Sequence, residues 1–231
     1  MHTLHSRKVK SLLIFLLLGF GVYAQPNLEQ YDNRILHFGF TLSTNIGKAF
    51  LETKTDQFPT DTLMQITTKS FPGIGLGVVT NLHLGDRLDL RLLAPVISFV
   101  QRNLQYDFPN SKKIVKVESA YCDASLLLKY KSARRKNTRL YVIGGGRLSY
   151  DFGSTVSKNR GIEDPVVSLV PWTYGWEAGV GLDFYFEYFK FSPEIKACQT
   201  LGNALYKDGY IFTNYIDRIA PQMIQISFHF E

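Results

Sequence analysis

Apolar and polar residues alternate with a period of two along most of the chain after residue 35, and the clearest case runs from Trp172 to Phe186. One face of this stretch is apolar with aromatic residues at both ends, whereas the other face is small, polar or charged. A period of two indicates a β-strand, and about 15 residues is far longer than the usual 5–6 of globular proteins. The pattern predicts a strand that crosses a lipid bilayer, with its apolar face outward and aromatic rings at both interfaces.

Seven further segments show the same alternation, and the links between the predicted strands are alternately short and long. The other predicted strands are 36–43, 73–84, 88–106, 123–130, 140–151, 191–197 and 224–231. Pro95 lacks the N–H that a central strand position needs, so we expect a bulge there. The pattern predicts an all-β fold, an eight-stranded antiparallel transmembrane β-barrel with short periplasmic turns and longer extracellular loops.

The first residues have the pattern of an export signal. Arg7, Lys8 and Lys10 precede a short apolar run, and Ala24 closes a small-residue cleavage site. We therefore expect a signal peptide at 1–24, a short periplasmic segment at 25–35 and a barrel domain at 36–231 in the outer membrane. Removing the signal lowers the formal net charge from +6 to +3, so no nucleic-acid partner is predicted.

The composition agrees with this architecture. Hydrophobic residues make up 45% of the chain, and the mean hydropathy is −0.06. Such a value is usual for soluble proteins, but a barrel with a lipid-facing apolar side and a polar lumen also averages near zero. Two cysteines, Cys122 and Cys198, leave open both one disulfide and two free thiols.

Charged residues of both signs occupy the inward positions of the predicted strands. A barrel of eight strands has an interior just wide enough to be filled by side chains, and an unpaired buried charge is costly. We therefore expect a lumen network of paired charges, with a polar path for a small solute as the alternative. The predicted network consists of Arg91, Asp123, Lys129, Arg147, Glu177, Asp183, Glu194 and Lys196.

Three histidines, His37, His83 and His229, share inward positions near the periplasmic ends of neighbouring strands. Three imidazoles are able to bind zinc, but histidines that simply line the lumen mouth are the simpler interpretation. No G-x-S-x-G or H-E-x-x-H motif occurs. We therefore predict no enzymatic activity, catalytic residue, metal, cofactor or small-molecule substrate.

The predicted turn between the fourth and fifth strands is strongly basic, with Arg134, Arg135 and Lys136 in succession. One interpretation is a solvated turn beside anionic lipid headgroups. The other is a periplasmic docking patch for an acidic protein partner.

Several segments resemble the PorT family, outer-membrane β-barrel components associated with type IX protein secretion and gliding motility. The similar segments are YDNR (31–34), LHFGF (36–40), FVQRNLQY (99–106), LLLKYK (126–131), YFKFSPE (188–194), TNYIDR (213–218) and ISFHFE (226–231). They follow one another in the family's order over nearly the whole mature chain. The resemblance implies an eight-stranded barrel with a role in secretion or in assembling the secretion machine, and it supplies no catalytic residues.

Two other functions fit an exported barrel. An adhesin-like barrel would bind extracellular ligands through its long loops. A lipocalin-type barrel would have an apolar interior and hold a ligand there, but the aromatic face of Trp172 to Phe186 would then have to crowd into the cavity.

Overall fold

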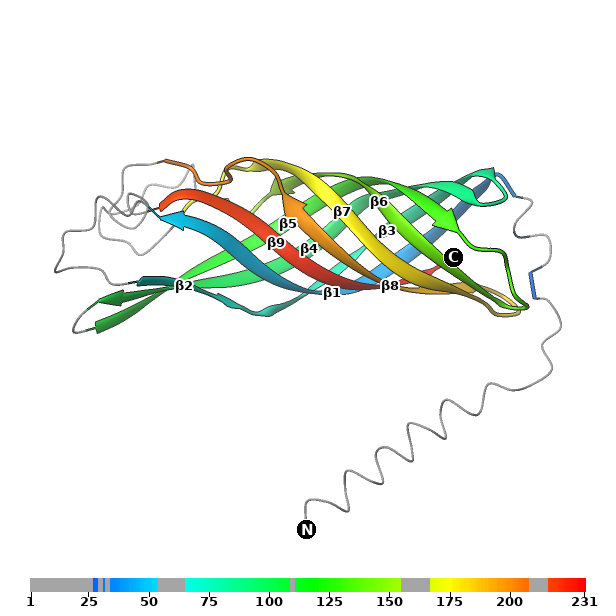
Figure 1. The fold of residues 1–231 in the computed structure, drawn as a ribbon, viewed down its shortest axis with the longest axis horizontal. Coiled ribbons are helices and arrows are strands. Elements are labelled where there is room, and N and C mark those ends of the chain that lie inside the picture. Colours follow the sequence, from blue (N-terminus) through cyan, green and yellow to red (C-terminus); the bar gives the residue numbers. More distant parts are fainter. Residues whose placement is uncertain are drawn as a thin grey trace, which may run out of the picture.

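The computed structural model describes residues 27–28, 31, 34–53, 65–108, 111–154, 167–207 and 216–231. They form one antiparallel sheet that is rolled into an elongated tube (Figure 1). The strands are β1 (Leu36–Thr53), β2 (Gln65–Ser70), β3 (Pro72–Gly85), β4 (Leu88–Phe108), β5 (Ser111–Lys131), β6 (Thr138–Asp151), β7 (Trp172–Tyr185), β8 (Lys190–Thr200) and β9 (Ile216–Phe230). No helix in these ranges is both long and apolar enough to cross a membrane.

The sheet closes into a barrel because the last strand, β9, pairs with the first, β1. The other strands pair in chain order, except that β1 pairs with β3 and the short β2 pairs with β4. Around the barrel the order is β4-β3-β1-β9-β8-β7-β6-β5, and β4 also pairs with β5. β2 pairs with residues 102–107 of β4, and β3 pairs with residues 88–99 of the same strand. β2 and β3 are therefore successive pieces of one wall strand. The wall therefore has eight strands, and the predicted fold class is confirmed.

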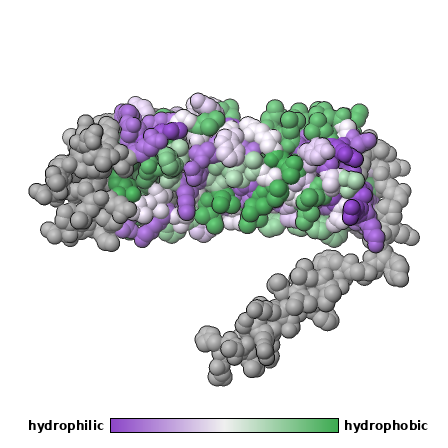
Figure 2. Space-filling model, in the orientation of Figure 1, coloured by the Kyte–Doolittle hydropathy of each residue, from purple (hydrophilic) through white to green (hydrophobic). Residues whose placement is uncertain are grey.

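The two faces of the wall carry the side chains that the alternation predicted. Outward residues are apolar and exposed, such as Phe38 (65% exposed) and Val180 (48%), whereas inward Thr41 and Glu177 are each 2% exposed. Apolar residues are prominent along the central part of the wall and hydrophilic residues are frequent towards its ends (Figure 2). This is the surface that a bilayer-spanning barrel requires.

The strands of the extracellular half are longer than predicted. The segment between residues 106 and 123, expected as a long loop, instead continues β4 and β5 as a hairpin paired as far as Phe108 and Ser111. This hairpin extends beyond most other strands (Figure 1). The expected bulge at Pro95 is confirmed, because the pairing of β4 with both neighbours shifts around it.

An apolar core that the sequence pattern did not reveal fills the extracellular end of the barrel. Segments 167–170 and 204–206 fold inward and pair with each other through Val170 N–H to the Ala204 carbonyl (2.9 Å) and Tyr206 N–H to the Ser168 carbonyl (3.0 Å). We call this core the apolar plug. It consists of Leu104, Val115, Val117, Val167, Leu169, Ala204, Leu205, Ile216 and Ile219, all buried.

Both cysteines are free thiols, with Cys198 buried in the lumen and Cys122 half-buried in β5. The predicted signal peptide at 1–24 and residues 54–64, 155–166 and 208–215 of the predicted long loops lie outside the described residues.

Candidate functional site

The periplasmic half of the lumen is filled by ion pairs, and Arg91 on β4 lies at their centre. Its Nη1 is 2.6 Å from Glu194 Oε2, its Nη2 is 3.4 Å from Glu231 Oε1, and its Nε donates to Asn81 Oδ1 at 2.8 Å. Tyr141 adds a hydrogen bond to Glu194 at 2.9 Å. The guanidinium is therefore satisfied by residues of two other strands, β3 and β8, and by the last residue of the chain.

A second pair lies beside the first. Lys129 Nζ on β5 is 2.7 Å from Asp183 Oδ2 on β7, and it lies 3.8 Å from the centre of the Tyr141 ring. Ser192 on β8 donates to Asp183 at 2.6 Å. Both charged side chains are almost fully buried, so each depends on the other for compensation.

A third group lies closer to the extracellular side. Glu177 on β7 accepts from Lys196 at 2.7 Å and lies 3.7 Å from Arg147 Nε. Asp123 makes no direct ion pair with a described residue, but it interacts electrostatically with Arg147 and accepts a hydrogen bond from Ser98 at 3.1 Å. The structure thus brings seven of the eight predicted lumen charges into direct ion pairs.

These pairs occupy the space that a solute path would need. Arg91 and Asp183 are 0% exposed and Glu177 is 2% exposed, although all three lie inside the lumen. Removing one partner of a buried pair is strongly destabilising, so each pair requires both of its members. This geometry favours a structural interior over the polar-path alternative.

The three inward histidines do not meet at one point. The His37 imidazole contacts the Tyr31 carbonyl at 2.8 Å, His83 contacts Asp89 at 2.9 Å, and His229 contacts Glu194 at 3.4 Å. No group of three metal-ligand side chains occurs among the residues that the structure describes. The geometry therefore gives the zinc hypothesis no support.

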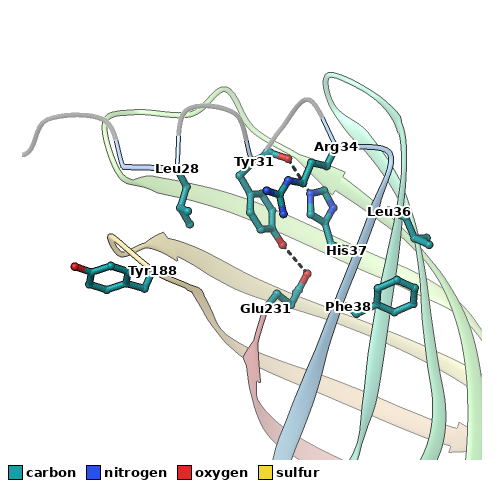
Figure 3. Close-up of a pocket in the computed structure, with 8 residues that line it drawn as sticks. All are labelled: Leu28, Tyr31, Arg34, Leu36, His37, Phe38, Tyr188 and Glu231. Carbon is teal, nitrogen blue, oxygen red and sulfur yellow. Dashed lines mark hydrogen bonds between the residues drawn. The ribbon is translucent and has the colours of Figure 1, made fainter.

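A short segment before β1 crosses the periplasmic mouth, and we call its described residues Asn27, Leu28, Tyr31 and Arg34 the N-terminal strap. The Tyr31 ring points into the mouth, where it stacks on His37 with 4.0 Å between ring centres and donates to Glu231 Oε2 at 3.2 Å (Figure 3). Lys190 Nζ lies 4.7 Å from the ring centre. Tyr31 therefore contacts the first strand, the start of β8 and the chain's last residue.

The other end of the strap is held on the opposite side of the mouth. Asn27 N–H donates to Asn137 Oδ1 at 2.9 Å, and Asn27 Nδ2 donates to the Tyr185 carbonyl at 3.2 Å. Arg134 donates to the Asn27 carbonyl and stacks on the Tyr185 ring at 3.8 Å. Because β7 and β6 are three and four strands from β1 around the barrel, the strap spans the mouth.

Charge and burial reinforce the contact between Tyr31 and Glu231. Burial alone would raise the pKa of the Glu231 carboxyl, but Lys190 and Arg91 outweigh it and hold that pKa well below its usual range. Burial, followed by the adjacent Glu231 carboxylate, raises the pKa of the Tyr31 phenol well above its usual range. A neutral phenol therefore donates to an ionised carboxylate across the normal pH range.

A cavity of about 470 Å³ remains between the strap and the barrel rim. Its polar side is formed by Tyr31, His37 and Glu231, and its outer side by Leu36, Phe38 and Tyr188 (Figure 3). Arg34 also lines it and is exposed. The cavity combines polar, apolar and cationic surface, as a site for a segment of another protein would.

The three basic residues of the turn between β5 and β6 are not equivalent, because one contacts the strap and two are exposed. Arg134 holds the strap, so it is not available for docking as the sequence alone suggested. Arg135 and Lys136 are exposed. Sequence reasoning also missed the roles of Tyr31 and Asn27, because both precede the alternating segments, and the resemblance of the YDNR segment that Tyr31 opens assigned it no contact.

The chain is similar to known outer-membrane proteins. A family model described as an outer membrane protein beta-barrel domain matches residues 7–206. Similar solved structures include the outer membrane protein OprG from Pseudomonas aeruginosa (11% identity, 84% of this chain and 91% of that one, TM-score 0.45). They also include Neisserial surface protein A (7%, 84% and 97%, 0.43) and Ail, the attachment invasion locus protein of Yersinia pestis (11%, 84% and 96%, 0.34). No curated protein sequence matches the chain.

Proposed function

This chain belongs to the outer membrane protein beta-barrel domain family, and from that premise we propose that it is a non-enzymatic accessory or assembly component of type IX protein secretion. In this proposal it acts through contacts with other proteins and not as a conduit. The resemblance to the PorT family supports the secretion role, and gliding motility would follow from the same machine.

The observation that carries the proposal is that the lumen is filled at two levels. Arg91, Lys129 and their partners occupy the periplasmic half, and the apolar plug occupies the extracellular end. A narrow barrel filled in this way offers its faces to partners instead of a path to cargo.

The periplasmic rim is the face best suited to a partner. Arg135 and Lys136 project from the turn between β5 and β6, next to Arg134, which holds the strap. An acidic surface would be attracted to these exposed cations. The cavity beside the strap would receive an apolar side chain of the same partner.

The test is charge reversal at the two exposed positions only. Arg135→Glu with Lys136→Glu should abolish secretion of cargo while leaving the barrel folded in the outer membrane, because neither side chain supports the strap. The matched control is Lys69→Glu with Lys207→Glu, which changes two exposed lysines of the extracellular half. Normal secretion by the rim variant would contradict docking at this rim.

A second candidate function is binding of an extracellular ligand, and the β4–β5 hairpin favours it by reaching beyond most of the wall (Figure 1). Deleting the gene separates the two functions. Loss of exported cargo supports secretion, whereas loss of surface binding with normal export supports adhesion.

A further inference from the structure

Lys48 is the first charged residue on the outward face of β1, counted from the periplasmic end. The outward residues that precede it are Leu36, Phe38, Phe40, Leu42, Thr44 and Ile46. Lys48 is exposed. Exposed Phe50 follows it on the same face, as an aromatic girdle residue would. A long cation beside an apolar face extends its ammonium to the headgroup level of the bilayer, so Lys48 and Phe50 together mark the outer edge of the lipid-facing band on β1.

A hollow of about 190 Å³ lies in the outer wall beside Lys48, across β1, β9, β8 and β7. The Cα register places Lys48 opposite Gln222, Gln222 opposite Gln199 and Gln199 opposite Trp176. Tryptophan is enriched at the membrane–water interface. This polar row therefore lies where lipid headgroups would be.

The next outward row towards the periplasm is apolar. There, Ile46 lies opposite Ile224, Ile224 opposite Ala197 and Ala197 opposite Ala178. The small Ala197 sits between the larger Ile224 and Trp176, both of which line the hollow. The hollow thus has an apolar row on its periplasmic side and, next to it on the extracellular side, a row that contains one cation and two amides.

The charge of the hollow is uncompensated among the residues described. Lys48 is its one charged lining residue, and none of the ion pairs between described residues includes it. Two other exposed cations nearer the extracellular end are paired instead, Arg218 with Glu52 at 3.3 Å and Lys207 with Asp217 at 3.5 Å. The hollow therefore complements an anion attached to an apolar chain.

We propose that this hollow binds one molecule of a phosphate-bearing membrane lipid from the extracellular leaflet. The lipid phosphate pairs with Lys48 and accepts from Gln222, and an acyl chain lies over Ala197 between Trp176 and Ile224. The Lys48 cation and the amides of Gln199 and Gln222, next to an apolar groove, favour such a lipid over a neutral one. The inference concerns the outer wall and does not depend on the proposed secretion role.

The test compares two lipids that differ in the phosphate alone. The full barrel in neutral detergent is titrated with phosphatidic acid or with diacylglycerol of the same chains, and bound lipid is counted by native mass spectrometry. The wild-type protein should bind one phosphatidic acid several-fold more tightly than diacylglycerol. Lys48→Gln should reduce phosphatidic acid binding about fivefold, as expected for the loss of one cation near a lipid surface.

Two further variants guard the interpretation. Lys207→Gln, which removes an exposed and paired cation elsewhere, should bind phosphatidic acid like the wild type. Ala197→Phe should fill the hollow and weaken binding of both lipids, with folding checked by the mobility of the unheated barrel on a gel. Equal binding of the two lipids by the wild-type protein, or unchanged phosphatidic acid binding by Lys48→Gln, would overturn the proposal.

Discussion

The two ends of this barrel are closed by opposite chemistry. The periplasmic half is filled by buried ion pairs such as Lys129 with Asp183, and the strap covers its mouth with Tyr31. The extracellular end is filled by the apolar plug, in which Leu104 is 1% and Val115 is 0% exposed. The same wall strands line both regions, so the medium around the wall accounts for the difference.

Across the bilayer, the outward face must be apolar, and the alternating strand then directs its polar residues inward, where each charge needs a partner. Beyond the bilayer the wall meets water. Exposed pairs such as Arg218 with Glu52 lie outside there, and the inward face becomes apolar as in a water-soluble protein. The barrel is thus a membrane protein in one part and resembles a soluble β-barrel in the other.

The largest expected effect follows from breaking one buried ion pair. Lys129→Met should lower the free energy of unfolding by about 3–5 kcal/mol, because Asp183 would remain buried without its counterion. Urea unfolding of the reconstituted barrel, followed by tryptophan fluorescence, measures the change.

A double variant tests whether the missing partner is the cause. Lys129→Met with Asp183→Leu should recover most of the lost stability, because an apolar pair can replace a buried ion pair at little cost. Lys207→Ala, which breaks the exposed pair with Asp217, should have almost no effect. A double variant as unstable as the single one would show that packing, and not charge, governs this position.

In the apolar plug, a smaller loss is expected from removing buried hydrocarbon. Leu104→Ala should cost about 2–4 kcal/mol, since it deletes a buried side chain and leaves a cavity. The same unfolding experiment applies. The loss of stability should be equal at pH 7 and pH 4, because the plug residues around the new cavity are all apolar. A clear dependence on pH would contradict the division into a polar and an apolar region.

The smallest effect concerns acid at the periplasmic mouth. The pKa of Glu231 is lower in the folded protein than in the unfolded chain, so its stabilising contribution is complete above the ordinary carboxyl pKa of about 4.3 and is lost as the pH falls further. The stability difference between the wild type and Glu231→Gln should therefore be constant from pH 7 to about pH 5 and shrink below about pH 4.

Tyr31→Phe serves as the matched control for this contact. It removes the hydroxyl that donates to Glu231 and keeps the stacking on His37, so it should cost about 1 kcal/mol at neutral pH. A stability difference between the wild type and Glu231→Gln that grows as the pH falls would show that Glu231 is not held ionised by Lys190 and Arg91.

Much of the fold was predictable because a membrane strand repeats one simple rule. The alternation from Trp172 to Phe186 placed every outward side chain of β7 correctly, and Pro95 marked a real irregularity. The rule failed where the medium changes. Val115 and Val117 lie on the same face of β5, but this apolar face points inward. A search for strands with apolar residues outside therefore takes the segment between residues 106 and 123 for a loop.

The candidate site was predictable only in part, for a different reason. The inward charges could be named from parity, but parity does not say that Arg91 contacts Glu194 or that Asp123 accepts its hydrogen bond from Ser98. Arg134 appeared to be one of three equivalent cations, yet the folded chain uses it to hold Asn27.

Local sequence therefore settled which side of each strand faces lipid, since the period of two belongs to the strand itself. It also identified eight of the charges that enter the lumen, but it missed Asp89, Lys131 and Lys190, which are buried there as well. Partners in the lumen, the strap across the mouth and the plug at the other end depend on closure of β1 against β9. Only closure brings residues as distant in the chain as Tyr31 and Glu231 into contact, and no local pattern encodes that distance.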